Sequence, residues 1–148
     1  VVQRKGIEHA IELIAKLIAA LQGDLMMTGQ WPERKVLYLI WKRPWMTVSQ
    51  DTYIASMLAL FGMRTLCHDP ARRYPEVTID PALLAQADLV LFSTEPFPFA
   101  TKHRNAFKND HAISSQPKLL SIDGKMVSWY GSRAIEGLKY LRQFAAKL

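Results

Sequence analysis

The chain has 148 residues and a net charge of +6, with 49% hydrophobic and 22% charged residues. That length allows one domain with a hydrophobic core. No apolar run reaches the roughly 18 residues that span a bilayer, so we expect a protein that is not embedded in a membrane. The basic residues form no Lys/Arg run, which argues against nucleic acid as a partner. The single cysteine, Cys67, excludes an intrachain disulfide and a cysteine-based metal cluster.

Residues 2–22 predict one long amphipathic helix. Apolar residues recur at steps of three and four, and Gly23-Asp24 supplies a stop signal. The sequence starts inside this helix without a methionine, so we expect further residues upstream, and the lack of a visible signal peptide does not identify a compartment. We therefore separate residues 1–30, a helix and a turn, from residues 31–148, an α/β lobe.

The second region alternates strands with helices. Strands are predicted at residues 35–41, 64–67, 88–93 and 118–122. Helices are predicted up to Phe61, from Asp80-Pro81, over residues 102–109 and over residues 132–147. The apolar runs suit strands that are buried on both faces. This order predicts a Rossmann-like, three-layer α/β/α fold with a mostly parallel sheet, preceded by the long helix.

Two helix starts have candidate caps. Thr47 or Ser49 could cap the helix that ends at Phe61, with Asp51 in its first turn. Asp80 is expected to cap the next helix, with Pro81 at the first helical position.

Aromatic residues gather after the predicted strands, where parallel sheets bind their ligands. Trp41 and Phe92 are expected to lie in the core, whereas Trp45, next to Pro44 and polar residues, is expected to be exposed. Trp129 and Tyr130 follow the last strand. Such flat surfaces suit a large planar or hydrophobic ligand, or a protein partner.

Signals for catalysis or for a resident cofactor are weak. No glycine-rich phosphate loop is present, and Ser93 lacks the Gly-x-Ser-x-Gly elbow that a triad with His68 and Asp123 would need. We therefore expect no enzyme, no cofactor and no metal site. His68 is expected to form a loop hydrogen bond, while the other three histidines, His9, His103 and His111, are expected to face solvent.

Arg133 opens the last helix, an unfavourable place for a cation. It is expected either to pair with Asp123 or Glu95, or to contact an anionic group of a ligand.

Three segments together resemble the helical-backbone (class III) periplasmic substrate-binding proteins of ABC importers, a family of receptors for cobalamin, siderophores, haem and metals. They are the long helix followed by residues 36–41, the stretch 69–78 that ends with an aromatic and a proline before a helix, and residues 122–133 before the final helix. The resemblance covers essentially all 148 residues but only half of a typical member, namely its inter-lobe helix and C-terminal lobe.

The resemblance implies a periplasmic receptor that holds a metal chelate between two lobes and docks to a permease. Its ligand contacts would be Trp45, Tyr74, Trp129 and Tyr130, and its docking residues Glu76 and Asp80. Arg133 joins the candidate ligand contacts on the separate ground of its position at the start of the last helix. A lone lobe would leave part of the first helix's apolar stripe uncovered, so we expect a homodimer. Two alternatives stay open: a flavodoxin-like or Rossmann-like enzyme, and a regulatory or interaction domain that uses the same loops.

Overall fold

The computed structural model describes residues 6–15, 31–128 and 133–148. The chain divides into two compact units, one formed by Val1–Pro32 and Lys125–Leu148, the other by Glu33–Gly124. Over the described residues, no helix combines the length and the apolar character that crossing a bilayer requires.

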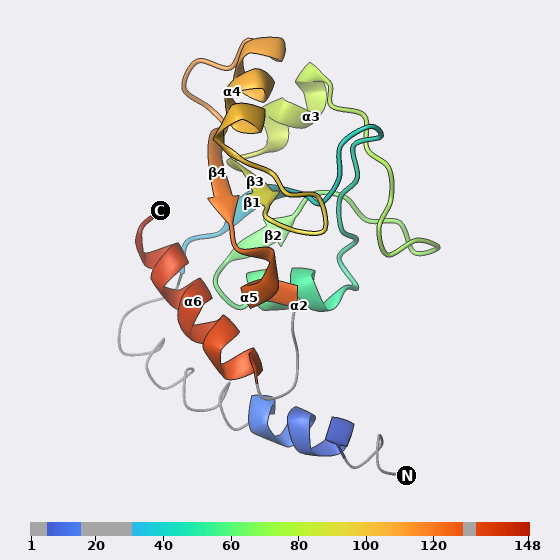
Figure 1. The fold of residues 1–148 in the computed structure, drawn as a ribbon, viewed down its shortest axis with the longest axis vertical. Helices are drawn as coiled ribbons and strands as arrows, with labels where there is room; N and C mark the ends of the chain where they lie inside the picture. Colours follow the sequence, from blue (N-terminus) through green and yellow to red (C-terminus); the bar gives the residue numbers. More distant parts are fainter. Residues whose placement is uncertain (1–5, 16–30, 129–132) are drawn as a thin grey trace. The chain divides into compact units, whose positions relative to one another are not determined.

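The Glu33–Gly124 unit is built on a sheet of four parallel strands in the order β2-β1-β3-β4 (Figure 1). The strands are β1 (Arg34–Leu39), β2 (Met63–Thr65), β3 (Leu89–Ser93) and β4 (Lys118–Ile122). β1 and β3 lie in the middle, and every side chain of β3 is buried. Their buried apolar runs, Val36–Leu39 and Leu89–Phe92, are therefore those of strands covered on both faces, as predicted.

Helices cover both faces of this sheet. Helix α2 (Tyr53–Ala59) lies on one side, and α3 (Pro81–Gln86) and α4 (Thr101–Asp110) lie on the other (Figure 1). The prediction of an α/β/α fold with a parallel sheet is confirmed. Asp80 caps α3 as expected, because its Oδ1 accepts a hydrogen bond from the Leu83 N–H at 2.8 Å and Pro81 follows at the first helical position.

The core between the sheet and α3/α4 is rich in aromatic side chains. Phe92 of β3 and Phe107 of α4 are almost completely buried, and their rings meet edge to face at 5.2 Å. Phe99, from the loop between these elements, packs against Phe92 at 5.4 Å. Burial of each such ring stabilises the fold by about 1.5–3 kcal/mol, so this core holds the loop after β3 firmly in place.

The prediction for the start of α2 was wrong. Thr52 is the N-cap: its Oγ1 accepts from the Ala55 N–H at 3.2 Å, so Asp51 precedes the helix. Thr47 and Ser49 are fully buried and use their hydroxyls elsewhere, Thr47 by donating to the Tyr38 carbonyl at 2.6 Å. Because the hydroxyls of Thr47 and Ser49 bind partners distant in the sequence, only the Thr52 hydroxyl caps the helix.

The other unit contains helical residues 6–15 and α6 (Ala134–Ala146), and α5 (Gly124–Ser128) leads into it. α6, within the helix predicted over residues 132–147, buries a stripe that includes Leu138 and Leu141, whereas the short helix α5 was not predicted. The remainder of the predicted first helix, its stop at Gly23-Asp24, and the predicted ligand contacts Trp129 and Tyr130 lie outside the described residues.

Candidate functional site

Three loops meet at the edge of the sheet where the parallel strands end, and we call them the strand-end loops. They are residues 41–46 after β1, residues 94–99 after β3, and residues 73–77, which return alongside the first loop. In parallel sheets this edge is where ligands bind.

The loop after β1 is a short hairpin. The Ile40 N–H donates to the Met46 carbonyl at 2.9 Å, and the Met46 N–H donates to the Trp41 carbonyl at 3.2 Å. The Phe97 N–H donates to the Ile40 carbonyl at 3.2 Å, which ties the loop after β3 to the end of β1. The two loops that follow the central strands therefore share one backbone network.

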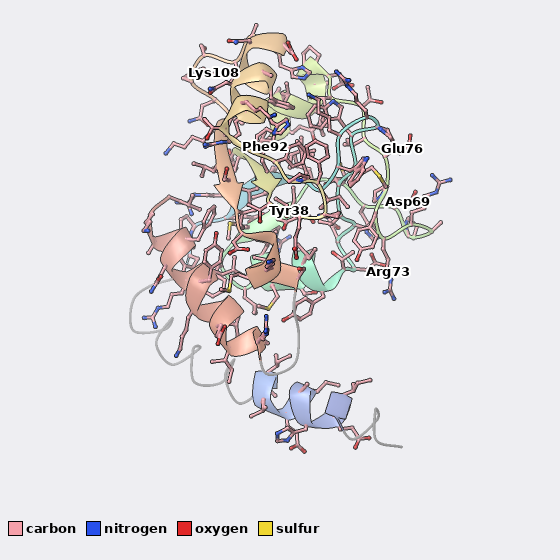
Figure 2. All side chains as sticks on the ribbon, in the orientation of Figure 1. Tyr38, Asp69, Arg73, Glu76, Phe92 and Lys108 are labelled. Carbon is pink, nitrogen blue, oxygen red and sulfur yellow. The ribbon has the colours of Figure 1, made fainter. Side chains whose placement is uncertain are left out.

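Residues 73–77 run antiparallel to residues 45–49. Three backbone hydrogen bonds join them: Val77 N–H to the Trp45 carbonyl at 2.9 Å, Thr47 N–H to the Pro75 carbonyl at 3.0 Å, and Ser49 N–H to the Arg73 carbonyl at 2.8 Å. The structure thus brings Trp45 together with the segment that carries Tyr74 and Glu76, two further residues predicted from the sequence. Figure 2 shows Asp69, Arg73 and Glu76 along one side of this unit, away from the buried Tyr38 and Phe92.

Ser49 anchors the turn that precedes Tyr74. Its buried hydroxyl donates to the Arg72 carbonyl at 2.6 Å and accepts from the Asp69 N–H at 3.0 Å. Asp69 Oδ1 in turn accepts from the Ala71 N–H at 2.9 Å. This turn, between β2 and α3, is consequently held by hydrogen bonds at both of its ends.

Trp41 is the main departure from the sequence prediction at this edge. It was expected in the core, yet it is 39% exposed, and its ring stands edge-on to Phe97 at 5.5 Å. The hairpin carries it out of the sheet at the point where β1 ends. Tyr74, a predicted ligand contact, is 48% exposed. Trp41 and Tyr74 therefore offer aromatic surface to solvent from two of the strand-end loops.

Trp45 is less exposed than the sequence suggested. It is half-buried against the core, stacked on Phe99 with an interplanar angle of 5° and a centroid separation of 6.1 Å, and edge-on to Phe107 at 5.4 Å. Lys42 Nζ lies 5.9 Å from the centroid of its ring, within the range of a cation–π contact. Trp45 therefore packs mainly against the aromatic core and presents only part of its ring to solvent.

His103 and His111, predicted to face solvent, are half-buried, because each packs on a phenylalanine. His103 contacts the Phe97 and Phe99 rings at 5.2 and 5.7 Å, and His111 contacts Phe107 at 4.4 Å. The Nδ1 of His103 accepts from the Ala100 N–H at 2.9 Å at the start of α4. Burial, followed by the charges of Lys102 and Lys42, lowers the pKa of His103, which favours the neutral ring that this hydrogen bond requires.

The serine at the end of β3 is part of the framework. Ser93 is fully buried; its hydroxyl donates to the Glu95 carbonyl at 2.6 Å and accepts from Tyr38 Oη at 3.1 Å. His68 instead accepts from the Gln50 N–H at 3.3 Å, as the loop hydrogen bond predicted for it. The triad considered from the sequence is therefore not assembled.

The remaining predicted positions are placed as follows. Glu76 and Asp80 are both exposed, with Glu76 in a backbone bridge to Met46. Arg133 is exposed and is the N-cap residue of α6. It therefore lies just before the first turn of the helix, whereas the sequence placed it within that turn. Among the described residues, no three His, Cys, Asp or Glu side chains group in a way that could hold a metal ion.

Comparisons with known proteins agree with this architecture. No protein-family model matches the sequence, and no curated protein matches it. Among solved structures, the periplasmic vitamin B12 binding protein BtuF of Vibrio cholerae superposes with a TM-score of 0.62 at 17% identity, covering 86% of this chain and 51% of that one. The periplasmic heme binding protein HutB of Vibrio cholerae gives 0.62 at 19% identity, covering 97% and 56%.

The periplasmic heme-binding protein RhuT from Roseiflexus sp. RS-1 gives a TM-score of 0.65 at 18% identity, covering 97% of this chain and 57% of that one. This chain therefore has the fold found in part of these periplasmic binding proteins, as the resemblance implied, and it spans about half of their length.

Proposed function

We propose that this chain is the inter-lobe helix (within residues 1–30) and C-terminal lobe (residues 31–148) of a substrate-binding protein that serves an ABC importer in the periplasm. The observation that carries the proposal is the arrangement of the strand-end loops, which present Trp41 and Tyr74 at the ligand-binding edge of a fold shared with periplasmic vitamin B12 and heme binding proteins. Its role would be to bind a ligand and deliver it, rather than to catalyse a reaction.

The proposed ligand is a metal chelate such as cobalamin, haem or a ferric siderophore. Trp41, backed by Phe97, gives a flat apolar face of the kind that planar ligands contact. Trp45 would support this face through Phe99, whose ring contacts Phe97 at 4.5 Å. Contacts from neighbouring segments would come from Tyr74, Trp129, Tyr130 and Arg133.

The charges near Trp41 favour an anionic member of this ligand class. The positive charges of Lys102 and Lys42 contribute to the lowered pKa of His103, whose ring packs against Phe97. Within the described part of the chain neither lysine forms an ion pair. Haem, with two carboxylates, and ferric catecholates are anionic, so these lysines would attract them.

Fluorescence titration of the full-length protein tests this proposal. We expect saturable tryptophan quenching by haem or by a ferric catecholate siderophore, and weaker quenching by cobalamin. Trp41→Ala should raise the Kd by about tenfold, whereas Trp41→Phe, which keeps an aromatic face, should recover most of the affinity. The proposal fails if none of the three ligands binds, or if Trp41→Ala binds as tightly as the parent.

We further propose that Glu76 and Asp80 dock to basic residues of the permease. Both carboxylates are exposed, and each stands at a fixed backbone position, Glu76 in the bridge to Met46 and Asp80 at the start of α3. The double variant Glu76→Gln/Asp80→Asn should lower the binding-protein-dependent ATPase activity of the importer and leave ligand affinity unchanged. Asp51→Asn, at another exposed acid, is the matched control; equal activity in both variants would exclude this docking surface.

The isolated chain is proposed to form a homodimer through its first helix. Ile7 and Ile11, one turn apart, are 61% and 59% exposed. Apolar side chains in such a row are stabilised by a partner that covers them. Light scattering should report a dimer that Ile7→Glu/Ile11→Glu converts to a monomer, and a monomeric parent at high concentration would refute it.

A further inference from the structure

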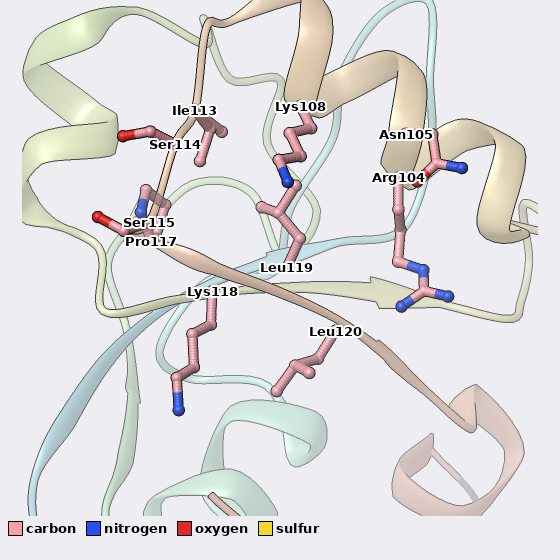
Figure 3. Close-up of a pocket in the computed structure, with 10 residues that line it drawn as sticks. All are labelled: Arg104, Asn105, Lys108, Ile113, Ser114, Ser115, Pro117, Lys118, Leu119 and Leu120. Atoms are coloured by element: carbon pink, nitrogen blue, oxygen red, sulfur yellow. The ribbon is translucent and has the colours of Figure 1, made fainter.

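A cavity between α4 and β4 lies away from the strand-end loops. Its volume is about 330 Å³, and it is lined by α4, by the loop over residues 113–117 and by the first residues of β4 (Figure 3). Because those residues belong to the start of β4, the cavity lies near the edge of the sheet where the strands begin. The strand-end loops lie at the opposite edge. Its size is at the lower limit for pockets that bind small molecules.

The charged side chains of this cavity are all basic. Arg104 and Lys108, one turn apart on α4, point toward β4, whereas the side chain of Lys118 points away from α4 (Figure 3). None of the three forms an ion pair within the part of the chain that the structure describes. A neighbouring cavity of about 470 Å³, between α3 and the end of α4, has Asp110 among its lining residues and no Lys or Arg.

Arg104 carries an unused donor here. Its Nη2 donates to Thr101 Oγ1 at 3.1 Å, but its Nε is buried and meets no hydrogen-bond acceptor among the described residues. A buried guanidinium N–H without an acceptor is costly, so an anion that pairs with the rest of this guanidinium would offset part of that cost. Guanidinium groups pair best with carboxylates and phosphates.

The floor of the cavity is apolar. Leu119 points up from β4 toward Lys108, with Ile113 beside it (Figure 3). Both side chains are half-buried and pack against the aromatic core. A ligand that fits would therefore combine a compact anionic head for Arg104 and Lys108 with a small apolar body for this floor.

We propose that the α4/β4 cavity is a second binding site, for a small organic anion that has a phosphate or carboxylate group on an apolar body. It does not depend on the proposed chelate site, because the two share no residue. Occupancy would neutralise Arg104 and cover Leu119 without involving the strand-end loops.

Nuclear magnetic resonance of the 148-residue chain with phenyl phosphate as the probe tests the site. We expect saturable shifts of the Arg104 Nε–H and of the backbone amides of residues 113–120, and no comparable shifts with phenol, which lacks the charge. Arg104→Gln should raise the Kd by about tenfold or more, the loss of one charged hydrogen bond. Lys102→Gln, on the same helix but outside the cavity, is the matched control and should change the Kd less than about twofold.

Lys108→Gln gives an independent test, because this exposed side chain can be replaced without disturbing the core. It should also weaken phenyl phosphate binding while the rest of the spectrum stays unchanged. Shifts that do not saturate, shifts that phenol reproduces, or a Kd that neither variant at residues 104 and 108 changes would each overturn the proposal.

Discussion

The N-cap of α3 allows the structural role of Asp80 to be separated from its proposed role in docking. Asp80 has extended backbone angles, φ −124° and ψ 166°, and its carboxylate accepts the Leu83 N–H at 2.8 Å. Alanine removes both the cap and the charge, whereas asparagine removes only the charge, since its side-chain oxygen can accept the same hydrogen bond.

Asp80→Ala should lower the free energy of unfolding by about 1 kcal/mol, the usual cost of losing an N-cap. Asp80→Asn should stay within about 0.5 kcal/mol of the parent, because only a modest interaction with the helix dipole is lost. α3 has only six residues and one buried side chain, Leu84. Short helices are marginal alone, so the cap is expected to matter in full.

Urea unfolding followed by circular dichroism measures these differences, with the slope checked for constancy across the variants. If Asp80→Asn costs as much as Asp80→Ala, the charge rather than the hydrogen bond holds the helix start. If neither variant costs anything, the cap does not contribute to stability. Either result would refute the reasoning, and the first would also remove Asp80→Asn as a clean probe of docking.

Three further predictions concern His103, Gly124 and Cys67. The pKa of His103 is lowered in the folded chain, so as pH falls below about 6.5 the unfolded chain binds a proton at His103 before the folded chain does. The free energy of unfolding should therefore decrease as pH falls toward the lowered pKa, and it should decrease less steeply in His103→Gln. Gly124→Ala should cost about 1–3 kcal/mol, because its Cβ would overlap Ser93 Oγ and lie 2.8 Å from Glu95 Cγ, and the cost should shrink when Ser93 is already alanine. Burial raises the pKa of the Cys67 thiol, so at pH 8 a thiol reagent should label it more slowly in the folded chain than in urea, and equal rates would show that the thiol is exposed.

Local signals in the sequence were enough for much of the fold. β4 has the predicted bounds, residues 118–122, and α3 begins at the predicted Asp80-Pro81 pair. In both places a short-range pattern, an apolar run or a cap followed by proline, agrees with the tertiary structure. The order of strands and helices then determines the class of fold.

The features that the sequence did not reveal depend on contacts between distant residues. Trp41 continues an apolar run, so its exposure follows only from the hairpin that turns the chain at the end of β1. The half-burial of Trp45 depends on Phe99 and Phe107, more than fifty residues later in the chain. The α4/β4 cavity is likewise formed by segments whose spacing no local pattern encodes.

The strand-end loops are held in place by hydrogen bonds of the protein itself, and this bears on how such a site would work. Three backbone hydrogen bonds join residues 45–49 to residues 73–77, and the Ser49 hydroxyl fixes the turn ahead of them. Each such bond contributes about 1 kcal/mol, so the aromatic surface is ordered before binding and little conformational entropy remains to be lost when a ligand arrives. Affinity at this edge would then depend on the surface that Trp41 and Tyr74 present rather than on loop closure, which is why replacing Trp41 is the most direct test of the site.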